Sequence, residues 1–280
     1  TKHLCVSDQN KQPVAIVQVL SKGLPWLGYV ARINRGPLIM GSVNDEINAI
    51  KASKVIAILL NKMKAERCRY LSIAPEIVDT VGNTFTLKSI GLRRTNRLAN
   101  WSSGRLDLKK GEQALKDGLK PKWRNMLRKS QKLGVEVSEN TLVSDELENL
   151  ILHYQDHQQA KGYVGISAKL LRAMSSYQND DWSLSLFSCL AQNERHGRSE
   201  YLGQVVTVMS ADTATYLIGV VTPAGRSAQA NSALLWHSIC FSKRQGCLWF
   251  DTGGLGVSDV DRFKRGVNAS EYRLVGEWWC

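Results

Sequence analysis

Several features that define common protein classes are missing from this sequence of 280 residues. No apolar run approaches the roughly 18 residues that a membrane-spanning helix needs, and the longest candidate covers only residues 55–60. At most peripheral membrane contact is therefore expected. The sequence contains neither the Gly-x-Ser-x-Gly motif of serine hydrolases nor the phosphate-binding loop of nucleotide triphosphatases, so neither class is supported.

Paired metal-binding or redox cysteines are also missing. The six cysteines are scattered, none of them forms a Cys-x-x-Cys pair, and most lie within apolar runs. They are typical of buried thiols in a reducing compartment, and we expect a cytoplasmic protein. His153 and His157 are one helical turn apart, but the residues between them do not form a zinc-protease pattern and no third ligand is apparent. We expect no bound metal.

Positive charge is the most pronounced feature of what is present. The formal net charge is +12, which favours polyanionic partners such as RNA or an anionic lipid surface. A basic protein without such a partner has the same composition. Residues 105–132 contain ten Lys or Arg against three Asp or Glu. Within them, Pro121 suits the first turn of a helix whose inward stripe includes Trp123 and Leu127.

This predicted helix has almost no acidic residues among its cations from residue 120 to residue 133. A helix face that is stabilised by salt bridges mixes both signs of charge. A face of one sign can follow a phosphate backbone without reading the base sequence. A solvated charged face without a partner shows the same pattern, so both interpretations stay open.

The order of the predicted elements indicates an α/β protein. In the first half, strand-like segments at 13–20 and 28–40 precede a helical segment and a strand at 69–74. In the second half, Ser167 is expected to cap a helix. Strands at 182–190, 201–209 and 213–221 then precede a long helix at 228–244 and a strand at 247–250. Strands, a helix and a further strand thus occur twice. We expect two related α/β halves, the second of which begins near residue 140.

The aromatic run at 247–250 is followed by Asp251, Gly253 and Gly254. This pattern predicts a buried strand that enters a loop with unusual backbone angles. In α/β sheets, ligands and catalytic groups gather at the C-terminal ends of strands. We expect the loop to present Phe263 and Lys264, an aromatic ring beside a cation. Such a pair suits the binding of something anionic and reaction with an acyl group.

These residues also carry a family resemblance. Residues 249–254 (Trp-Phe-Asp-Thr-Gly-Gly) and 262–266 (Arg-Phe-Lys-Arg-Gly) resemble the C-terminal signature of the Fem family of peptidoglycan-bridge aminoacyltransferases. Residues 34–37 (Asn-Arg-Gly-Pro) and the basic helix at 122–134 resemble two further segments of the same family. The sequence departs from the family pattern where Val267 and Asn268 replace a Phe and a Gly. The family's N-terminal Gln-Ser-x-x-Trp segment has no counterpart before residue 13.

The resemblance implies two acetyltransferase-like (GNAT-type) domains, with mixed sheets flanked by helices and no coiled-coil arm. It implies that the last strand returns to the first domain, so that one domain has residues 1–139 and 270–280 and the other has residues 140–269. It implies a cofactor-independent enzyme that moves an aminoacyl group from aminoacyl-tRNA to an amine of a peptidoglycan precursor or of a peptide or amine metabolite. The expected catalytic residues are Lys264, Phe263 and Asp251. The expected substrate-binding residues are Gly253, Gly254, Arg35, Asn231 and Arg262. The expected tRNA-binding residues are Arg93, Arg94, Lys122, Arg124, Arg128, Lys129 and Lys132.

Two other functions stay open. An acyl-CoA-dependent N-acyltransferase acting on a sugar or polysaccharide precursor would use the same fold. Such enzymes resemble one another in a glycine-rich turn whose N–H groups bind the pyrophosphate of CoA. Residues 219–225 precede a helix here, but their glycines are spaced differently and Pro223 has no N–H to donate. A non-catalytic RNA-binding module would keep the basic helix without needing Lys264. Asp251 either accepts a proton from the acceptor amine or only caps its loop.

Overall fold

The computed structural model describes residues 1–41, 45–95, 100–140, 144–193, 198–256 and 258–280. The chain forms two compact units, Thr1–Ser102 with Tyr272–Cys280, and Ser103–Glu271. The last strand returns to the sheet of the first unit, as the sequence predicts. The N-terminal segment of the first unit ends at residue 102, whereas the sequence predicts that it ends at residue 139. Residues 103–139 lie in the second unit, because β7 (Ser102–Asp107) pairs with β12 (Trp249–Asp251) and the basic helix packs against α8 (Ala230–Arg244).

The first unit is a mixed sheet with the strand order β1-β2-β3-β5-β14-β6, and β4 pairs with β2 beside this path. Its strands are β1 (Lys2–Ser7), β2 (Pro13–Leu24), β3 (Gly28–Asn34), β4 (Leu38–Ile39), β5 (Cys68–Ala74), β6 (Arg93–Arg94) and β14 (Trp278–Trp279). Its helices are α1 (Asp45–Ala65) and α2 (Val81–Ser89). Along β2, Val17 and Val19 are buried while Ile16 and Leu20 are exposed. This alternation follows the period of two in a strand, and it places the core on one face of the sheet.

The second unit is a mixed sheet with the strand order β13-β7-β12-β11-β10-β9-β8. The strands besides β7 and β12 are β8 (Val135–Asn140), β9 (Trp182–Asn193), β10 (Arg198–Ser210), β11 (Thr213–Val221) and β13 (Ser270–Arg273). The helices besides α8 are α3 (Glu112–Gly118), α4 (Pro121–Lys132), α5 (Ser144–Lys161), α6 (Ala168–Ser176), α7 (Pro223–Ser227) and α9 (Asp259–Lys264), and α9 continues into a 3₁₀ turn, Arg265–Val267.

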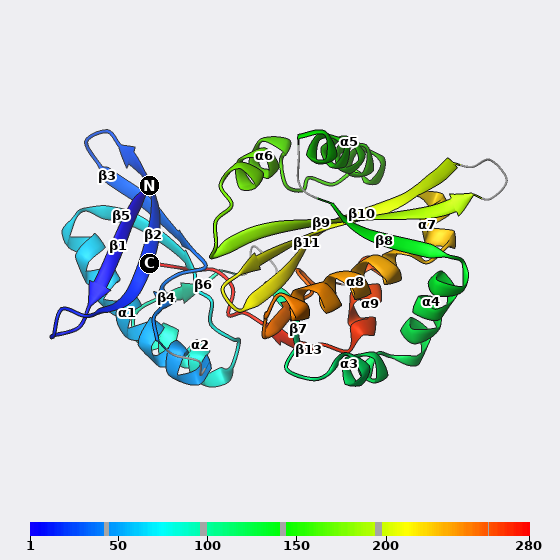
Figure 1. Cartoon of the computed structure of the whole chain (residues 1–280). Helices are drawn as coiled ribbons and strands as arrows, with labels where there is room; N and C mark the ends of the chain where they lie inside the picture. Colours follow the sequence, from blue (N-terminus) through cyan, green and yellow to red (C-terminus); the bar gives the residue numbers. More distant parts are fainter. Residues whose placement is uncertain (42–44, 96–99, 141–143, 194–197, 257) are drawn as a thin grey trace. The chain divides into compact units, whose positions relative to one another are not determined.

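Helices cover both faces of this second sheet (Figure 1). Neighbouring residues of β9 point to opposite faces: Leu186 packs in a cluster with α5 and α6, and Phe187 packs in a cluster with α8. Both side chains are fully buried. The strand is therefore apolar on both sides, as strands of helix-covered sheets are.

Local sequence signals explain where several helices begin. Ser167, the predicted cap, accepts a hydrogen bond from the backbone N–H of Leu170 at 3.2 Å, and α4 begins at Pro121 as predicted. The long helix predicted at 228–244 is confirmed as α8, and Gln229, which adopts a left-handed conformation with a φ of 60°, separates it from the short helix α7. Within the described residues, no helix is both long and apolar enough to cross a lipid bilayer.

The 3₁₀ turn after α9 packs against the basic helix, α4, and thereby fixes this helix on the second unit. Gly266 lies against the buried Trp123 of α4 so closely that a Cβ on this glycine would be 2.2 Å from Cδ1 of the indole. The backbone N–H of Lys120 donates to the carbonyl of Gly266 at 3.0 Å, and the rings of Trp123 and Phe263 stack at 5.7 Å. Only a residue without a side chain fits at position 266.

We predict that Gly266→Ala lowers the free energy of unfolding by about 1–3 kcal/mol, the usual cost of overpacking a core. Urea unfolding of the purified variant measures this change. Gly118→Ala is the matched control, because a Cβ at that position meets nothing within 4 Å. Equal stability of the two variants would contradict the proposed packing of α4.

Candidate active site

The candidate site begins where two parallel strands separate. β12 pairs with β11 only from Thr213 to Thr215, and the last pair joins Thr215 to Asp251. After Asp251 the chain leaves the sheet and Gly253 turns back against β11, with a φ of 70°. A Cβ at Gly253 would lie 2.6 Å from the carbonyl oxygen of Tyr216. Both the backbone angle and the close approach therefore require glycine, which explains this residue of the predicted signature.

Asp251 holds this loop in place. The Oδ1 atom of its buried carboxylate accepts a hydrogen bond from the backbone N–H of Gly253 at 2.8 Å. The hydroxyl of Ser103, which is fully buried on β7, lies between Oδ1 of Asp251 and the carbonyl oxygen of Gly253, 2.9 Å from the latter. Thr252 forms two hydrogen bonds with the backbone of Gly104 on the same strand. These contacts support the capping role for Asp251.

Lys264 lies beneath the loop, with only 8% of its surface exposed. Its ammonium donates to the carbonyl oxygen of Gly254 at 3.2 Å and lies 4.8 Å from the centroid of the Tyr216 ring. Both neighbours favour a cation, the first through its lone pairs and the second through its π face. The ammonium also lies next to Gly253, where a Cβ would be 3.6 Å from Nζ.

Burial sets the electrostatics of this group. Desolvation lowers the pKa of Lys264 below its ordinary value of 10.5, and the carboxylates of Asp261 and Asp251 partly oppose this change. Burial raises the pKa of the Tyr216 phenol far above its usual range, so the ring stays neutral. A cation that is removed from water in this way interacts strongly with any negative charge that develops beside it.

Lys264 lies on a short helix rather than on the predicted loop. Ser258 caps α9 by accepting a hydrogen bond from the N–H of Asp261, and the Asp261 carboxylate accepts one from the N–H of Ser258. Although partial burial raises the pKa of Asp261, the hydrogen bonds from Ser258 and Gly256 hold it below its usual value. The Ser-x-x-Asp spacing is a capping-box signal of the kind that marks helix starts, so the start of this helix was visible in the sequence.

Arg265 stabilises the later part of the loop that follows β12. Its guanidinium donates to both carboxylate oxygens of Glu271, at 3.0 and 3.1 Å, and to the carbonyl of Gly256 at 2.8 Å. Asn268, which replaces a family glycine, has a left-handed φ of 59°, a conformation that Asn tolerates better than most residues do. Val267, which replaces a phenylalanine, is buried in the core. Position 267 is thus an apolar core position, and position 268 is a turn position with a positive φ.

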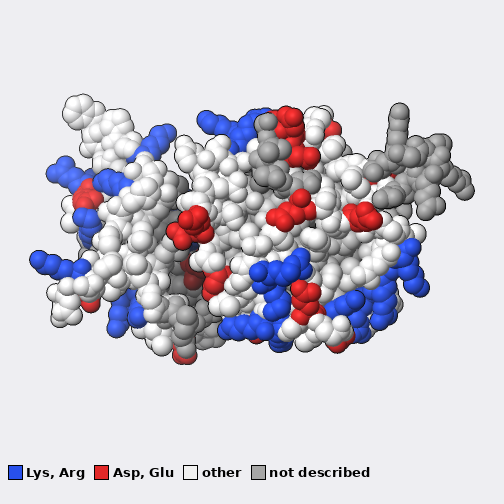
Figure 2. All heavy atoms as spheres, viewed as in Figure 1, with Lys and Arg blue, Asp and Glu red and all other residues white. Residues whose placement is uncertain are grey.

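The basic helix packs directly against this site. Phe263 is half-buried against Trp123, so it fills the space between α9 and α4. On the outer surface of α4 the exposed cations are Lys122, Arg128, Lys129 and Lys132. None of these four forms an ion pair with another described residue. Arg124 differs, since its guanidinium donates to the carbonyl of Asp117 at 2.7 Å. Figure 2 shows Lys and Arg side chains gathered over the α4 region.

The other predicted binding residues have different surroundings. Asn231 is half-buried in the first turn of α8, and Arg262 is exposed and pairs with Asp259 at 3.0 Å. Arg35, in the first unit, pairs with Glu76 at 2.9 Å and lies over the Trp101 ring at 4.9 Å. These contacts give Arg35 a structural role within its own unit.

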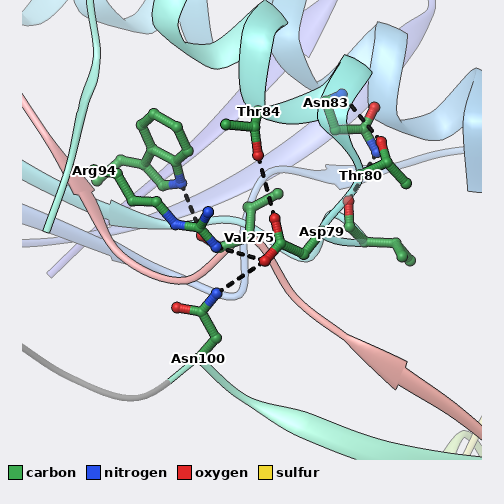
Figure 3. Close-up of polar contacts among 9 residues, drawn as sticks. Asp79, Thr80, Asn83, Thr84, Arg94, Asn100 and Val275 are labelled. Carbon is green, nitrogen blue, oxygen red and sulfur yellow. Dashed lines mark hydrogen bonds and ion pairs between the residues drawn. The ribbon is translucent and has the colours of Figure 1, made fainter. Parts of the chain in front are cut away.

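Arg93 and Arg94 also belong to the first unit. Figure 3 shows the guanidinium of Arg94 facing the carboxylate of Asp79, at 2.6 Å, where Thr84 and Asn100 also donate. Arg93 lies over the ring of Trp279 at 5.4 Å. The ion pair gives Arg94 a structural explanation that does not involve RNA.

Sequence reasoning missed Ser103 and Tyr216. The side chain of Ser103 contacts Asp251, which is 148 positions away in the sequence, and that of Tyr216 contacts Lys264, which is 48 positions away. Neither residue is part of a sequence motif. Only the pairing of β7 and β11 with β12 brings them there.

Comparison with known proteins identifies the architecture. A family model described as acetyltransferase (GNAT) domain matches residues 121–265. A crystal structure of FemX shares 14% identity over 99% of this chain and 87% of its own, with a TM-score of 0.78. No curated protein sequence matches the chain.

Two further solved structures have the same fold. One is the C-terminal DUF2156 domain of a protein named as lysylphosphatidylglycerol synthetase from Agrobacterium fabrum, with 9% identity, a TM-score of 0.56 and coverage of 99% of this chain and 83% of that one. The other is a tandem GNAT protein from the clavulanic acid biosynthesis pathway, with 14% identity, a TM-score of 0.54 and coverage of 98% and 80%. The fold of mixed sheets flanked by helices that the sequence predicted is thereby confirmed.

We predict that Lys264→Met changes how stability depends on pH. The folded state holds Lys264 with a lowered pKa, so between the folded and unfolded pKa values the unfolded chain binds more protons and stability rises with pH. Wild type therefore carries the full penalty of the buried charge near neutral pH and loses it as the pH approaches 10.5. The stability of the Met variant relative to wild type should fall over this range. Urea unfolding at several pH values measures it, and a constant difference would contradict the burial of the ammonium.

Proposed function

The chain belongs to the acetyltransferase (GNAT) family, and from this premise we propose that it transfers an aminoacyl group from an aminoacyl-tRNA to an amine acceptor. The observation that carries this proposal is the direct packing of the basic helix, α4, against the segment that holds the buried Lys264. A surface suited to RNA phosphates and a group suited to acyl chemistry are thus parts of one unit.

In the proposed reaction the acceptor nitrogen attacks the ester carbonyl carbon of the aminoacyl-tRNA. The carbonyl oxygen becomes negatively charged in the tetrahedral intermediate. Its collapse breaks the bond to the ribose oxygen, which takes up the proton that the nitrogen loses, and an amide remains. Because the ester is already activated, positioning and charge stabilisation are sufficient for catalysis. The ammonium of Lys264 supplies the positive charge, either at the carbonyl oxygen or at the departing ribose oxygen.

Asp251 is proposed to position the loop rather than to move a proton. Its Oδ1 atom already accepts the N–H of Gly253 and lies beside the hydroxyl of Ser103. Phe263 is likewise a positioning residue, because its ring stacks on Trp123 between α9 and α4. We assign tRNA binding to the exposed cations of α4, which are Lys122, Arg128, Lys129 and Lys132.

The geometry of α7 favours tRNA over acyl-CoA as the donor. In the position where a CoA pyrophosphate would need free N–H groups, the hydroxyl of Thr222 accepts the N–H of Gly225 at 3.0 Å, and Pro223 has no N–H. Gly225 is also pressed against β10: a Cβ there would be 2.0 Å from the carbonyl oxygen of Leu202. This turn serves packing between α7 and the sheet.

We propose a peptidoglycan precursor, or another peptide or amine metabolite, as the acceptor. The similarity in fold to FemX supports the first of these, and the named lysylphosphatidylglycerol synthetase supports aminoacyl transfer on this fold. A cytoplasmic location is proposed with it, since charged tRNA is found there.

The proposal is tested with a pool of radiolabelled aminoacyl-tRNAs, incubated with and without a nucleotide-linked muropeptide. We expect wild type to remove one amino acid from tRNA only when the acceptor is present. Lys264→Met should lower the rate by at least about a hundredfold, as does loss of a preorganised group that stabilises an oxyanion. Lys169→Met, which removes an exposed lysine of the same unit, should not.

Three results would contradict the proposal. Full activity of Lys264→Met would remove the assigned role. Failure to release label from tRNA with any acceptor, together with thermal stabilisation by CoA, would indicate an acyl-CoA enzyme. Equal binding of charged and uncharged tRNA without any release of label would indicate an RNA-binding module.

Asp251→Asn separates the two roles of this carboxyl group. Asn keeps an oxygen that can accept the N–H of Gly253, so a positioning role predicts that the variant retains most of the transfer rate. Steady-state kinetics under the same conditions measures it. A loss as large as that of Lys264→Met would show that the carboxylate accepts a proton.

A further inference from the structure

The turn between β2 and β3 contains a residue that its backbone does not favour. The N–H of Leu27 donates to the carbonyl of Leu24 at 3.1 Å, which closes a four-residue turn. Pro25 occupies the second position and Trp26 the third, where Trp26 has a φ of 66°. These are features of a type II turn, whose third position is normally Gly or Asn. A tryptophan in this backbone conformation lowers the free energy of unfolding. The stability of the turn therefore does not explain why a tryptophan occupies this position.

Trp26 also has no partner within the described part of the chain. Its exposed fraction is 101%, the highest of the large apolar side chains described, and that of the neighbouring Leu27 is 59%. The turn is nevertheless held firmly, because the guanidinium of Arg69 donates to the carbonyl of Leu27. Gly28 approaches Arg67 so closely that a Cβ would lie 2.2 Å from its carbonyl oxygen. The side chains of Trp26 and Leu27 are thus exposed to solvent on a turn that these contacts hold in place.

Cations surround this apolar tip. Lys22, Arg67 and Arg69 are exposed near it. The nearby carboxylate of Glu66 is neutralised, because Lys62 and Lys2 lie 2.8 and 3.9 Å from its oxygens. Once Glu66 is neutralised in this way, Lys22, Arg67 and Arg69 leave the base of the tip positively charged. In Figure 2 the turn protrudes at the upper left as neutral atoms, with Lys and Arg atoms below it.

We propose that this turn binds the surface of an anionic lipid bilayer. Trp26 and Leu27 enter the boundary between headgroups and acyl chains, where an indole ring is favoured. Lys22, Arg67 and Arg69 contact lipid phosphates, and such cations add to the affinity for anionic membranes. The apolar end of the tip matches the boundary between headgroups and acyl chains, and its cationic base matches the negative charge of the lipid phosphates. The proposal goes beyond the function proposed above and does not depend on it.

The experiment is sedimentation of the full chain with vesicles, either of phosphatidylcholine alone or of an equimolar mixture of phosphatidylcholine and phosphatidylglycerol. We expect wild type to bind the anionic vesicles and to bind the neutral ones weakly. Trp26→Asn should lower binding to the anionic vesicles about tenfold, which corresponds to the burial of one large side chain. A Lys22→Gln, Arg67→Gln double variant should lower it about thirtyfold on anionic vesicles and hardly at all on neutral ones.

Controls separate this effect from unfolding. Asn tolerates the left-handed conformation, so Trp26→Asn should unfold at the same urea concentration as wild type or a higher one. Tyr177→Ala removes another exposed aromatic residue, 79% accessible and in the other unit, and should bind vesicles like wild type. Wild type that binds neither vesicle, or Trp26→Asn that binds like wild type, would overturn the proposal. Self-association that Trp26→Asn abolishes, without vesicle binding, would assign the turn to a protein contact and would overturn it too.

Discussion

The candidate site depends on where the parallel pairing of β11 and β12 ends. Pairing stops at Thr215 and Asp251, so the chain after Asp251 must satisfy its polar groups without β11 beside it. The side chains of Asp251 and Ser103 form hydrogen bonds with the backbone of Gly253, and Gly253 folds back against Tyr216. Lys264 then occupies the space under the loop. A longer pairing would carry Gly253 and Gly254 along the sheet and leave no room for the ammonium.

A second constraint connects this site to the charged surface of the unit. α4 has a buried stripe of Trp123 and Leu127, and its solvent side carries exposed cations. Because the indole of Trp123 rests on Gly266 and Phe263, the helix cannot shift without moving the end of α9. The position of the cations relative to Lys264 is therefore fixed by packing within the second unit.

The predictable parts of this protein are those with local signals. The end of β12 followed from an aromatic run and two glycines, and the starts of α4 and α6 followed from Pro121 and Ser167. The domain boundary was not predicted, because the pairing of β7 with β12 joins residues more than 140 positions apart. Strand β8, which pairs with β9, was not predicted either. The six residues of α9 are too few for an apolar period, although Ser258 and Asp261 marked its start. Ser103 had no signal, since one serine in a strand resembles any other.

The most direct test of the link between α4 and the site is the affinity for aminoacyl-tRNA over a range of salt concentrations. A triple variant, Lys122→Gln with Lys129→Gln and Lys132→Gln, is compared with Lys51→Gln, Lys54→Gln and Lys88→Gln, which removes the same charge from exposed positions of the first unit. We predict weaker binding by the α4 variant, and a salt dependence whose slope falls by about one unit for each phosphate that the variant no longer neutralises. Equal affinity and equal slope for the two variants would contradict the account.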